Sequence, residues 1–414
     1  MRHVVDLAFR AAFVMVALPL LWLLEMLRPV RIGALLEDRI GHLAVNTDLY
    51  ARSARAAATS PRAKDIFLAW NPANRQLLAM WKRHLAIVES RWLRRAYIAC
   101  EPLLKRTRFQ AGLPMMPNDW HELLFTTPPI LGFSAAEEAR GRAELANMRI
   151  GPEDWFVCFH ARDPAYMGKR EGFGKAVYAP SYLDSSIDNH IPAMKWIAER
   201  GGFAVRVGAS VDHRLPDLGP RVIDYATRSR SDFMDIYLPA KCRFFFGTNS
   251  GLFSVALGFN RPFVLANMCP YPWVGPEERW ILDIPKLLRR RSDGRILSFP
   301  EIRDMGLLEC YRDDMDRLRR LFDGATYEEL GLEWVENDPE DILGLTMDMM
   351  DKVEGRAPPA EAVRLQGAFR ALYVRGYNGP LAGGIGPRFA LRYAHLIEPH
   401  KHDSADARRL RETA

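Results

Sequence analysis

Residues 156–163 read FVCFHARD, and this stretch decides how the second half of the chain is expected to fold. Four apolar residues, 156–159, suit a short buried strand. The strand ends abruptly in His160, Arg162 and Asp163, three ionisable side chains within four residues. Polar side chains directly after an apolar strand predict a ligand site at that point.

The same pattern recurs further along the chain. Short apolar segments at 203–207, 221–225, 243–246 and 262–266 alternate with segments of helical spacing. Short strands that alternate with helices predict a parallel sheet covered on both faces. We therefore expect residues 151–355 to form one doubly wound α/β domain, with its ligand at the carboxyl ends of the strands.

The length of 414 residues predicts about two or three domains. Before residue 151, a strand is expected at 63–70 and helices at 74–98 and 135–147, which together suit a smaller α/β domain. The predicted boundaries are 1–30, 31–150, 151–355 and 356–414.

Composition limits the classes of function. Hydrophobic residues make up 48% of the chain and charged residues 26%, as in a globular protein. The net charge of +6 suits phosphorylated ligands or an anionic membrane surface. No DNA- or RNA-binding motif accompanies it, so we expect no nucleic-acid partner. The five cysteines include no CxxC pair, which indicates neither a zinc site nor a disulfide framework and favours a reducing compartment.

An apolar run lies near the amino terminus. Residues 11–24 read AAFVMVALPLLWLL, shorter than the about 20 residues of a spanning helix. No small-residue cleavage site follows, and Arg10 and Arg28 flank the run. We predict an interfacial or re-entrant helix on the cytoplasmic leaflet. The alternative is a buried core helix of the first domain.

The strand ends supply the candidate site residues. GTNSG follows a predicted strand and opens a predicted helix from Ser250, so its amides and hydroxyls suit a diphosphate. An ordinary helix N-cap has the same residue types, so this alternative stays open. The candidates here are Gly247, Thr248, Asn249, Ser250 and Gly251, together with Gly208 after an earlier strand.

His160 and Arg162 point to the same side of an extended backbone. The arginine could bind a phosphate pair, and the histidine could act as a base or donate to phosphate. Asp163 could orient either one or act as the base itself. The alternative is a structural cluster that holds a loop.

Three further candidates each have a structural alternative. Arg206 lies inside an apolar strand, where it could bind the nucleotide or pair with Asp224 in the core. Asp232 precedes a predicted helix and could bind a base or ribose or be only an N-cap. Tyr166 lies in the long loop 164–187, which is either a lid over the sugar and phosphates or a surface insertion.

These residues together resemble a known family. FHARDPAY, then SYLDSSIDNHIPAMKWIAERGGFAVRVG, then VIDYATRSRSDFMDIYLPAKCRFFFGTNSGL follow one another along the chain. They resemble the glycosyltransferases of bacterial surface-polysaccharide loci, with HxRDxxY, RxG, IDY, SDFMD and GTxSG in that order. The resemblance covers about residues 31–275, including RIGHLAVNTDLY. The HxRxD element is more distantly similar to the fucosyltransferase superfamily, in which the arginine contacts the donor diphosphate.

The resemblance implies a GT-B architecture, in which two Rossmann-like domains face a cleft and the second holds a nucleotide-sugar. A helix over 361–373 would cross back to the first domain. It also implies transfer to a surface-glycan or lipid-linked acceptor by direct displacement with inversion, without metal or cofactor. Arg162, Arg206 and residues 247–251 would stabilise the leaving diphosphate, and the base would be His160, Asp163 or His42. The expected location is cytoplasmic, peripheral on the inner membrane.

The chain departs from the wider superfamily at one point. HARDP has a single arginine where some fucosyltransferases have a pair, so the identity of the donor does not carry over. Two other functions stay open, a non-catalytic polysaccharide-locus binding or scaffold protein and a GT-B nucleotide-sugar epimerase.

Overall fold

The structure is a computed structural model that describes residues 2–27, 29–56, 64–114, 121–163, 165, 181–271, 281–308, 315–372 and 384–399. The chain divides into two compact units, each described here by itself. Unit 1 comprises Met1–Gly141, Ser231–Ala240 and Ser254–Asn260. Unit 2 comprises Arg142–Arg230, Lys241–Phe253 and Arg261–Ala414.

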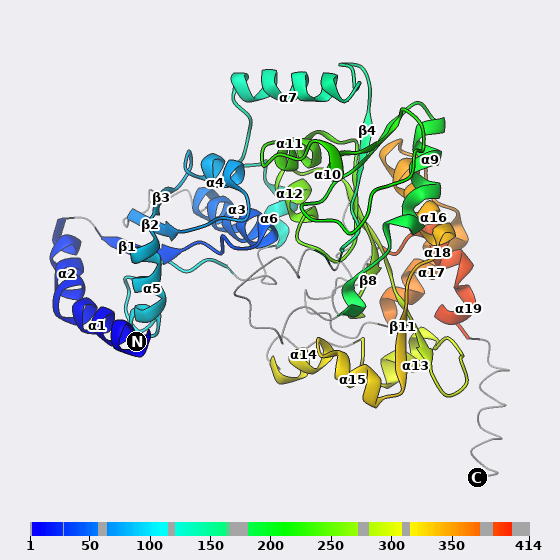
Figure 1. Cartoon of the computed structure of the whole chain (residues 1–414). Helices are drawn as coiled ribbons and strands as arrows, with labels where there is room; N and C mark the ends of the chain where they lie inside the picture. Colours follow the sequence, from blue (N-terminus) through cyan, green and yellow to red (C-terminus); the bar gives the residue numbers. More distant parts are fainter. Residues whose placement is uncertain are drawn as a thin grey trace, which may run out of the picture. The chain divides into compact units, whose positions relative to one another are not determined.

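Unit 1 is built on a parallel sheet in which β2 lies between β1 and β3 (Figure 1). On the other side of β1, the N–H of Ile32 donates to the Phe109 carbonyl at 2.7 Å, and the N–H of Ala111 donates to the Ile32 carbonyl at 3.0 Å. The order is therefore β3, β2, β1 and then 109–111, the beginning of a doubly wound sheet. Its elements are α1 (Arg2–Ala12), η1 (Phe13–Ala17), α2 (Leu18–Leu27), β1 (Val30–Ala34), α3 (Ile40–Ala56), β2 (Lys64–Ala69), α4 (Arg75–Trp81), β3 (Ala86–Glu89), α5 (Arg91–Leu104), α6 (His121–Thr126) and α7 (Ala135–Asn147), in which the division between the units falls.

The single helix predicted over 74–98 is wrong. The structure has α4, then the strand β3, then α5. Ala86–Glu89 pairs with Ile66–Ala69 of β2 in parallel register. Pairing with a distant strand outweighs a local helical spacing, which is a weaker determinant of structure.

Unit 2 is built on a six-stranded sheet whose neighbouring strands are all parallel. Its strands are β4 (Phe156–Phe159), β5 (Phe203–Arg206), β6 (Val222–Asp224), β7 (Phe245–Gly247), β8 (Phe263–Met268) and β9 (Ile281–Pro285). Their spatial order is β6-β5-β4-β7-β8-β9. By position along the chain this is the 3-2-1-4-5-6 order of doubly wound nucleotide-binding sheets, which confirms the predicted fold class for this unit. The order reverses between β4 and β7.

The core of unit 2 lies between this sheet and helices α9, α16, α17 and α18 (Figure 1). An antiparallel pair, β10 and β11, completes the unit. The remaining elements are η2 (Ser181–Leu183), η3 (Ile187–His190), α9 (Ile191–Glu199), α10 (Tyr225–Arg228), α11 (Met234–Lys241), α12 (Phe253–Gly258), β10 (Leu287–Arg290), α13 (Phe299–Asp304), α14 (Met315–Leu321), α15 (Gly324–Glu329), β11 (Leu332–Val335), α16 (Pro339–Val353), α17 (Ala360–Ala371), α18 (Pro387–Arg392) and α19 (Ala394–Ile397), with most of α11 and α12 in unit 1.

The units differ from the predicted domains in two respects. Residues 231–240 and 254–260 were expected in the second domain, but they pack in unit 1. There the fully buried Arg52 binds the carbonyl of Gly258 and the side chain of Asn260, each at 3.0 Å. The helix expected over 361–373 is α17, whose Leu365 and Phe369 are buried in the core of unit 2. This differs from the predicted crossing of residues 356–414 to the first domain, and residues 400–414 lie outside the described residues.

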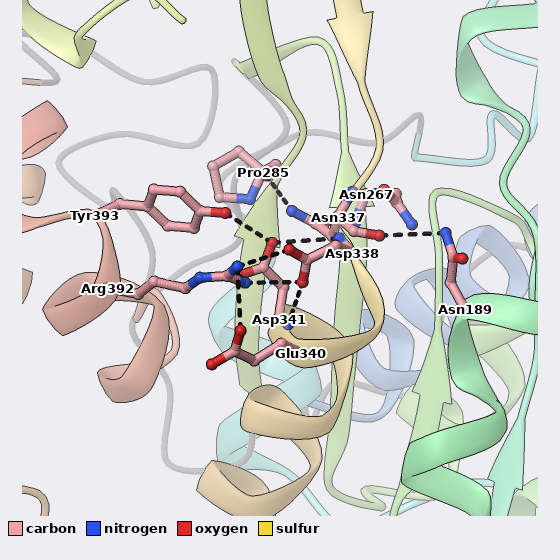
Figure 2. Close-up of polar contacts among 9 residues, drawn as sticks. All are labelled: Asn189, Asn267, Pro285, Asn337, Asp338, Glu340, Asp341, Arg392 and Tyr393. Carbon is pink, nitrogen blue, oxygen red and sulfur yellow. Dashed lines mark hydrogen bonds and ion pairs between the residues drawn. The ribbon is translucent and has the colours of Figure 1, made fainter.

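A polar network that includes the buried side chains of Asn267 and Asn337 fixes the carboxyl ends of β8 and β9 (Figure 2). The backbone N–H of Asn267 donates to the side-chain oxygen of Asn337 at 2.6 Å, and the backbone N–H of Asn337 donates to the side-chain oxygen of Asn267 at 2.8 Å. The Asn337 amide nitrogen also donates to the Pro285 carbonyl at 2.9 Å. Arg392 of α18 binds Asp338 and Asp341 at the start of α16, with distances of 2.7 and 2.8 Å. The network joins two strand ends to α16 and to the last part of the chain.

Asn337→Ala is expected to lower the free energy of unfolding by about 2–4 kcal/mol, because it leaves a buried N–H and a buried carbonyl without partners. Asn189→Ala is the matched control. The Asn189 amide makes only 3.4 Å contacts in the same network, so the loss should be about 1 kcal/mol or less. Urea unfolding of both variants measures the difference, and equal losses would contradict the assignment.

Candidate functional site

The loops that follow β4 and β7 are joined where the strand order reverses. The N–H of His160 donates to the Phe246 carbonyl at 2.8 Å, which extends the pairing of the two strands. Two residues later, the N–H of Arg162 donates to the Thr248 hydroxyl at 2.9 Å. Thr248 is fully buried. Its side chain therefore fixes Arg162 at the edge of the sheet where doubly wound domains bind ligands.

Arg162 belongs to a small cluster of charged side chains. Its Nε is 3.2 Å from Oδ1 of Asp184. Lys286 directly follows β9, and its Nζ donates to the Asp184 carbonyl at 2.7 Å and is 4.0 Å from Oε1 of Glu336. Burial raises the pKa of Asp184, while Arg162 and Lys286 oppose that shift. The cluster thus places two cations and two carboxylates at the carboxyl ends of β4 and β9.

His160 lies beside this cluster with a defined proton position. Its Nδ1 is 3.0 Å from the Val207 carbonyl. Because a carbonyl only accepts, we assign the proton to Nδ1, which leaves the lone pair on Nε2. Burial lowers the pKa of His160 to about 4. The ring is therefore neutral at pH 7, and Nε2 can accept a hydrogen bond or a proton.

Asp163 connects two of the strand-end loops. Its Oδ1 accepts from the N–H of Ala165 at 2.9 Å, and its Oδ2 accepts from the N–H of Asp212 at 2.8 Å. The first bond stays within the loop after β4, and the second reaches the loop after β5. Both oxygens of this predicted base are therefore used to hold backbone, a structural role that the sequence alternative included.

Arg206, at the end of β5, is 2% exposed. Its guanidinium donates to the His213 carbonyl at 2.7 Å and lies 3.6 Å from Oδ2 of Asp224. The structure thus shows the core pairing with Asp224 that was one of the two interpretations. Gly208 lies against the His160 ring, where an added Cβ would be 3.5 Å from Nδ1. That distance is an ordinary van der Waals contact, and the tighter contact of an added Cβ would be with Cγ1 of Val211 at 3.2 Å.

The glycine-containing loop 247–251 follows β7 as predicted, but the helix expected from Ser250 starts only at Phe253. The prediction of a helix start at Ser250 is therefore wrong, because Gly251 and Leu252 form a turn first. Gly247 is the last residue of β7, and the Asn249 amide donates to the Cys269 carbonyl. The buried Ser250 hydroxyl has no hydrogen-bond partner among the described residues.

Two predicted site residues lie in unit 1. His42 is in α3, with Nδ1 3.0 Å from the side-chain oxygen of Asn46. Asp232 accepts from the N–H of Arg75 at 2.8 Å, at the start of α4. It therefore satisfies a helix N-terminus 157 residues away along the chain. Tyr166 and most of the predicted lid lie outside the described residues.

The sequence analysis missed Asp184, His190, Lys286 and Glu336. Lys286 could have been found, because it follows ILDIP at 281–285, a mostly apolar segment interrupted by Asp283, and so obeys the same strand-end rule as Arg162. Asp184 and Glu336 lie in loops that only the folded chain brings together, and no local pattern marks them. His190 is fully buried next to Phe246, with ring centroids 5.1 Å apart.

In the part of the chain that the structure describes, no three His, Cys, Asp or Glu side chains come together in a way that could hold a metal ion. The metal independence expected from the resemblance stays a prediction.

Comparison with known proteins adds distant structural similarity. No family model and no curated protein matches the chain. A glycosyl transferase family 9 protein from Veillonella parvula is 11% identical, with a TM-score of 0.39 over 61% of this chain and 86% of that one. The ADP-heptose LPS heptosyltransferase II of E. coli is 18% identical, with a TM-score of 0.36 over 57% and 84%. The iron-containing dodecameric glycosyltransferase TibC from enterotoxigenic E. coli is 12% identical, with a TM-score of 0.34 over 59% of each chain.

These identities and TM-scores are low, so the fold and site described above rest on the geometry of this chain. None of the three proteins is a fucosyltransferase by name. The fucosyltransferase-like subtype and the family resemblance stay predictions.

The buried histidines predict how stability depends on pH. Burial lowers the pKa of His190 to about 4, below the ordinary value of 6.5. Between these pH values, His190 binds more protons in the unfolded chain than in the folded one. Its contribution to the free energy of unfolding is therefore full above pH 6.5 and is lost as the pH falls toward 4. His190→Leu should remove about 2–3 kcal/mol of this pH-dependent loss, measured by urea unfolding at pH 7 and pH 4.5. His213→Leu, at an exposed site, is the control, and an unchanged pH dependence in His190→Leu would contradict the assignment.

Proposed function

We propose that the chain is a glycosyltransferase that transfers a sugar from a nucleotide-sugar donor to a surface-glycan or lipid-linked acceptor. The observation that carries the proposal is the position of Arg162, held by Thr248 where the strand order of a doubly wound sheet reverses. Nucleotides bind at this point of such sheets. Four of the five motifs that resemble those of surface-polysaccharide glycosyltransferases begin at the carboxyl ends of β4, β5, β6 and β7, whereas SDFMD lies in unit 1.

The charged cluster suits a diphosphate. Arg162 and Lys286 supply two cations, and the Asp184 carboxylate beside Arg162 occupies a position that a phosphate oxygen could take. A guanidinium can bind two phosphate oxygens at once, whereas lysine acts as a point charge. Both groups would stabilise the negative charge that develops on the leaving nucleoside diphosphate. We therefore propose transfer without a metal ion.

We further propose that the reaction is a direct displacement with inversion and that His160 accepts the proton of the attacking hydroxyl. Its Nε2 carries the free lone pair, whereas both oxygens of Asp163 hold backbone amides. A pKa of about 4 makes the isolated imidazole a weak base. A bound diphosphate would raise this pKa, because an adjacent negative charge favours the imidazolium. His42 in unit 1 is the second candidate base.

We place the enzyme in the cytoplasm, at the inner membrane. The four cysteines that the structure describes are buried, and none of them forms a disulfide with another described cysteine, as expected in a reducing compartment.

Arg162→Ala is expected to weaken binding of the donor nucleotide about 10–100-fold, the effect of losing a charge-assisted contact. A thermal-shift screen of the intact protein against UDP, GDP, CMP, dTDP and ADP identifies the nucleotide, and titration then gives the affinity of each variant. Arg221→Ala, a partly exposed arginine of unit 2, is the control and should bind normally. If no nucleotide shifts the melting temperature of the folded wild type, the transferase proposal fails.

His160→Asn should leave nucleotide binding intact and lower kcat about 10²–10⁴-fold, because asparagine keeps a donor for Val207 but removes Nε2. Release of the nucleoside diphosphate, with and without acceptor, is the measurement once a donor is known. His42→Asn, tested alongside, separates the two candidate bases. Conversion of the donor to an isomer without any acceptor would instead identify an epimerase, and binding without turnover would identify a binding protein.

A further inference from the structure

The amino-terminal helices of unit 1 leave most of their apolar side chains exposed. The segment Val5–Leu27 is long and apolar enough to cross a membrane by length and composition alone. Leu27 is 87% exposed, Met26 83% and Met15 70%, and Leu7, Val16 and Leu23 are also exposed. An apolar surface of this kind on a folded unit marks a site of interaction with a partner or a membrane.

Both ends of this segment are held by α5 and the turn that follows it. Near the start, Nε of Arg10 donates to the Ala99 carbonyl at 2.8 Å, and Asp6 lies 3.8 Å from Arg95. The helices α1 and α5 pack along each other (Figure 1). The amino-terminal end of the segment is therefore fixed to α5.

Near its other end, Leu21 is 5% exposed and packs with Leu104 and Phe109. Trp22 contacts the edge of the Phe109 ring, with centroids 5.6 Å apart, and Arg108 lies 4.2 Å above the Trp22 ring. Both ends of the segment thus contact α5 or the turn that follows it.

These contacts are incompatible with a helix that crosses a bilayer. Residues 91–108 carry six lysines and arginines and a single glutamate. So many charges do not enter the hydrocarbon core, and a segment held by α5 near Arg10 and by the following turn near Leu21 cannot enter it without them. The segment must therefore stay on the surface of unit 1, with α1 against α5 and Leu21 against the turn after α5, and with most of its apolar side chains exposed.

The net positive charge of α5 and the turn after it indicates the partner. A strongly basic segment beside an exposed apolar helix complements anionic lipid headgroups above acyl chains. Tryptophan beside arginine, as in Trp22 and Arg108, is typical of the headgroup level. We propose that α1, α2 and α5 form a docking surface for an anionic phospholipid bilayer, with Val5–Leu27 lying in the plane of the membrane. The proposal does not depend on the transferase activity.

Sedimentation with vesicles tests the surface. The full chain should bind vesicles of phosphatidylcholine and phosphatidylglycerol, and bind pure phosphatidylcholine more weakly. Leu23→Glu and Met26→Glu should each reduce binding about tenfold or more, the effect of removing one buried apolar side chain. Val363→Glu is the matched control, because Val363 is 51% exposed on α17 of unit 2. Melting temperatures equal to that of the wild type exclude misfolding of the variants.

The orientation has its own readout. An amino-terminal tag on the full chain, bound to sealed vesicles, should be cleaved completely by protease added outside. Protection of the tag would overturn the in-plane orientation in favour of a spanning helix. Absence of vesicle binding, or equal binding by the Glu variants, would overturn the membrane surface. Self-association without lipid that the Glu substitutions abolish would instead assign the surface to a second copy of the chain.

Discussion

The strand order of unit 2 is the constraint on which the candidate site depends. Because β4 lies between β5 and β7, the segments that leave these strands diverge at their carboxyl ends, and a gap opens at the reversal. The bond from the Arg162 N–H to the Thr248 hydroxyl crosses this point. Asp163 holds the loop after β5 on the other side through Asp212. Side chains between β4 and its neighbours thus fix the backbone that carries His160 and Arg162, the two residues that we propose contact the donor.

Arg206 and Lys286 are both almost fully buried, but their charges are compensated to different degrees. Arg206 is paired with Asp224 and donates to a carbonyl, so its charge is compensated within the strand layer. Lys286 is buried just as deeply, but its nearest carboxylate oxygen is 4.0 Å away, and a carbonyl supplies its short contact. A cation without a close ion pair is more costly to bury and gains more from an added anion. Lys286 is therefore the better candidate for diphosphate binding, although Arg206 was the residue selected from the sequence.

The sequence predicts the architecture of unit 2 well because its strands are short, apolar and each followed by polar residues. It fails where a contact joins distant segments. By residue type alone, Asp232 could bind the nucleotide-sugar or cap a helix. Only the fold shows that it accepts a hydrogen bond from the N–H of Arg75. Ala86–Glu89 is mostly exposed and continues a helical spacing, so its pairing with β2 could not be seen locally. Asp184 and Glu336 become neighbours of Lys286 only through the paths of two loops, a relation that no local pattern carries.

The amino-terminal segment is a second case in which the sequence alone does not determine the structural outcome. Hydropathy distinguishes apolar from polar segments, but it does not distinguish a helix that crosses a bilayer from one that lies on it. The difference depends on what the helix is attached to. Here Arg10 binds the backbone of α5, and Leu21 packs against the turn after it. The apolar segment therefore cannot enter the bilayer unless this basic helix enters with it. Charges on α5 would have to lose their water for the segment to cross, and this cost outweighs the gain from immersing its remaining side chains. The orientation of the segment therefore follows from the polar character of the element that holds it.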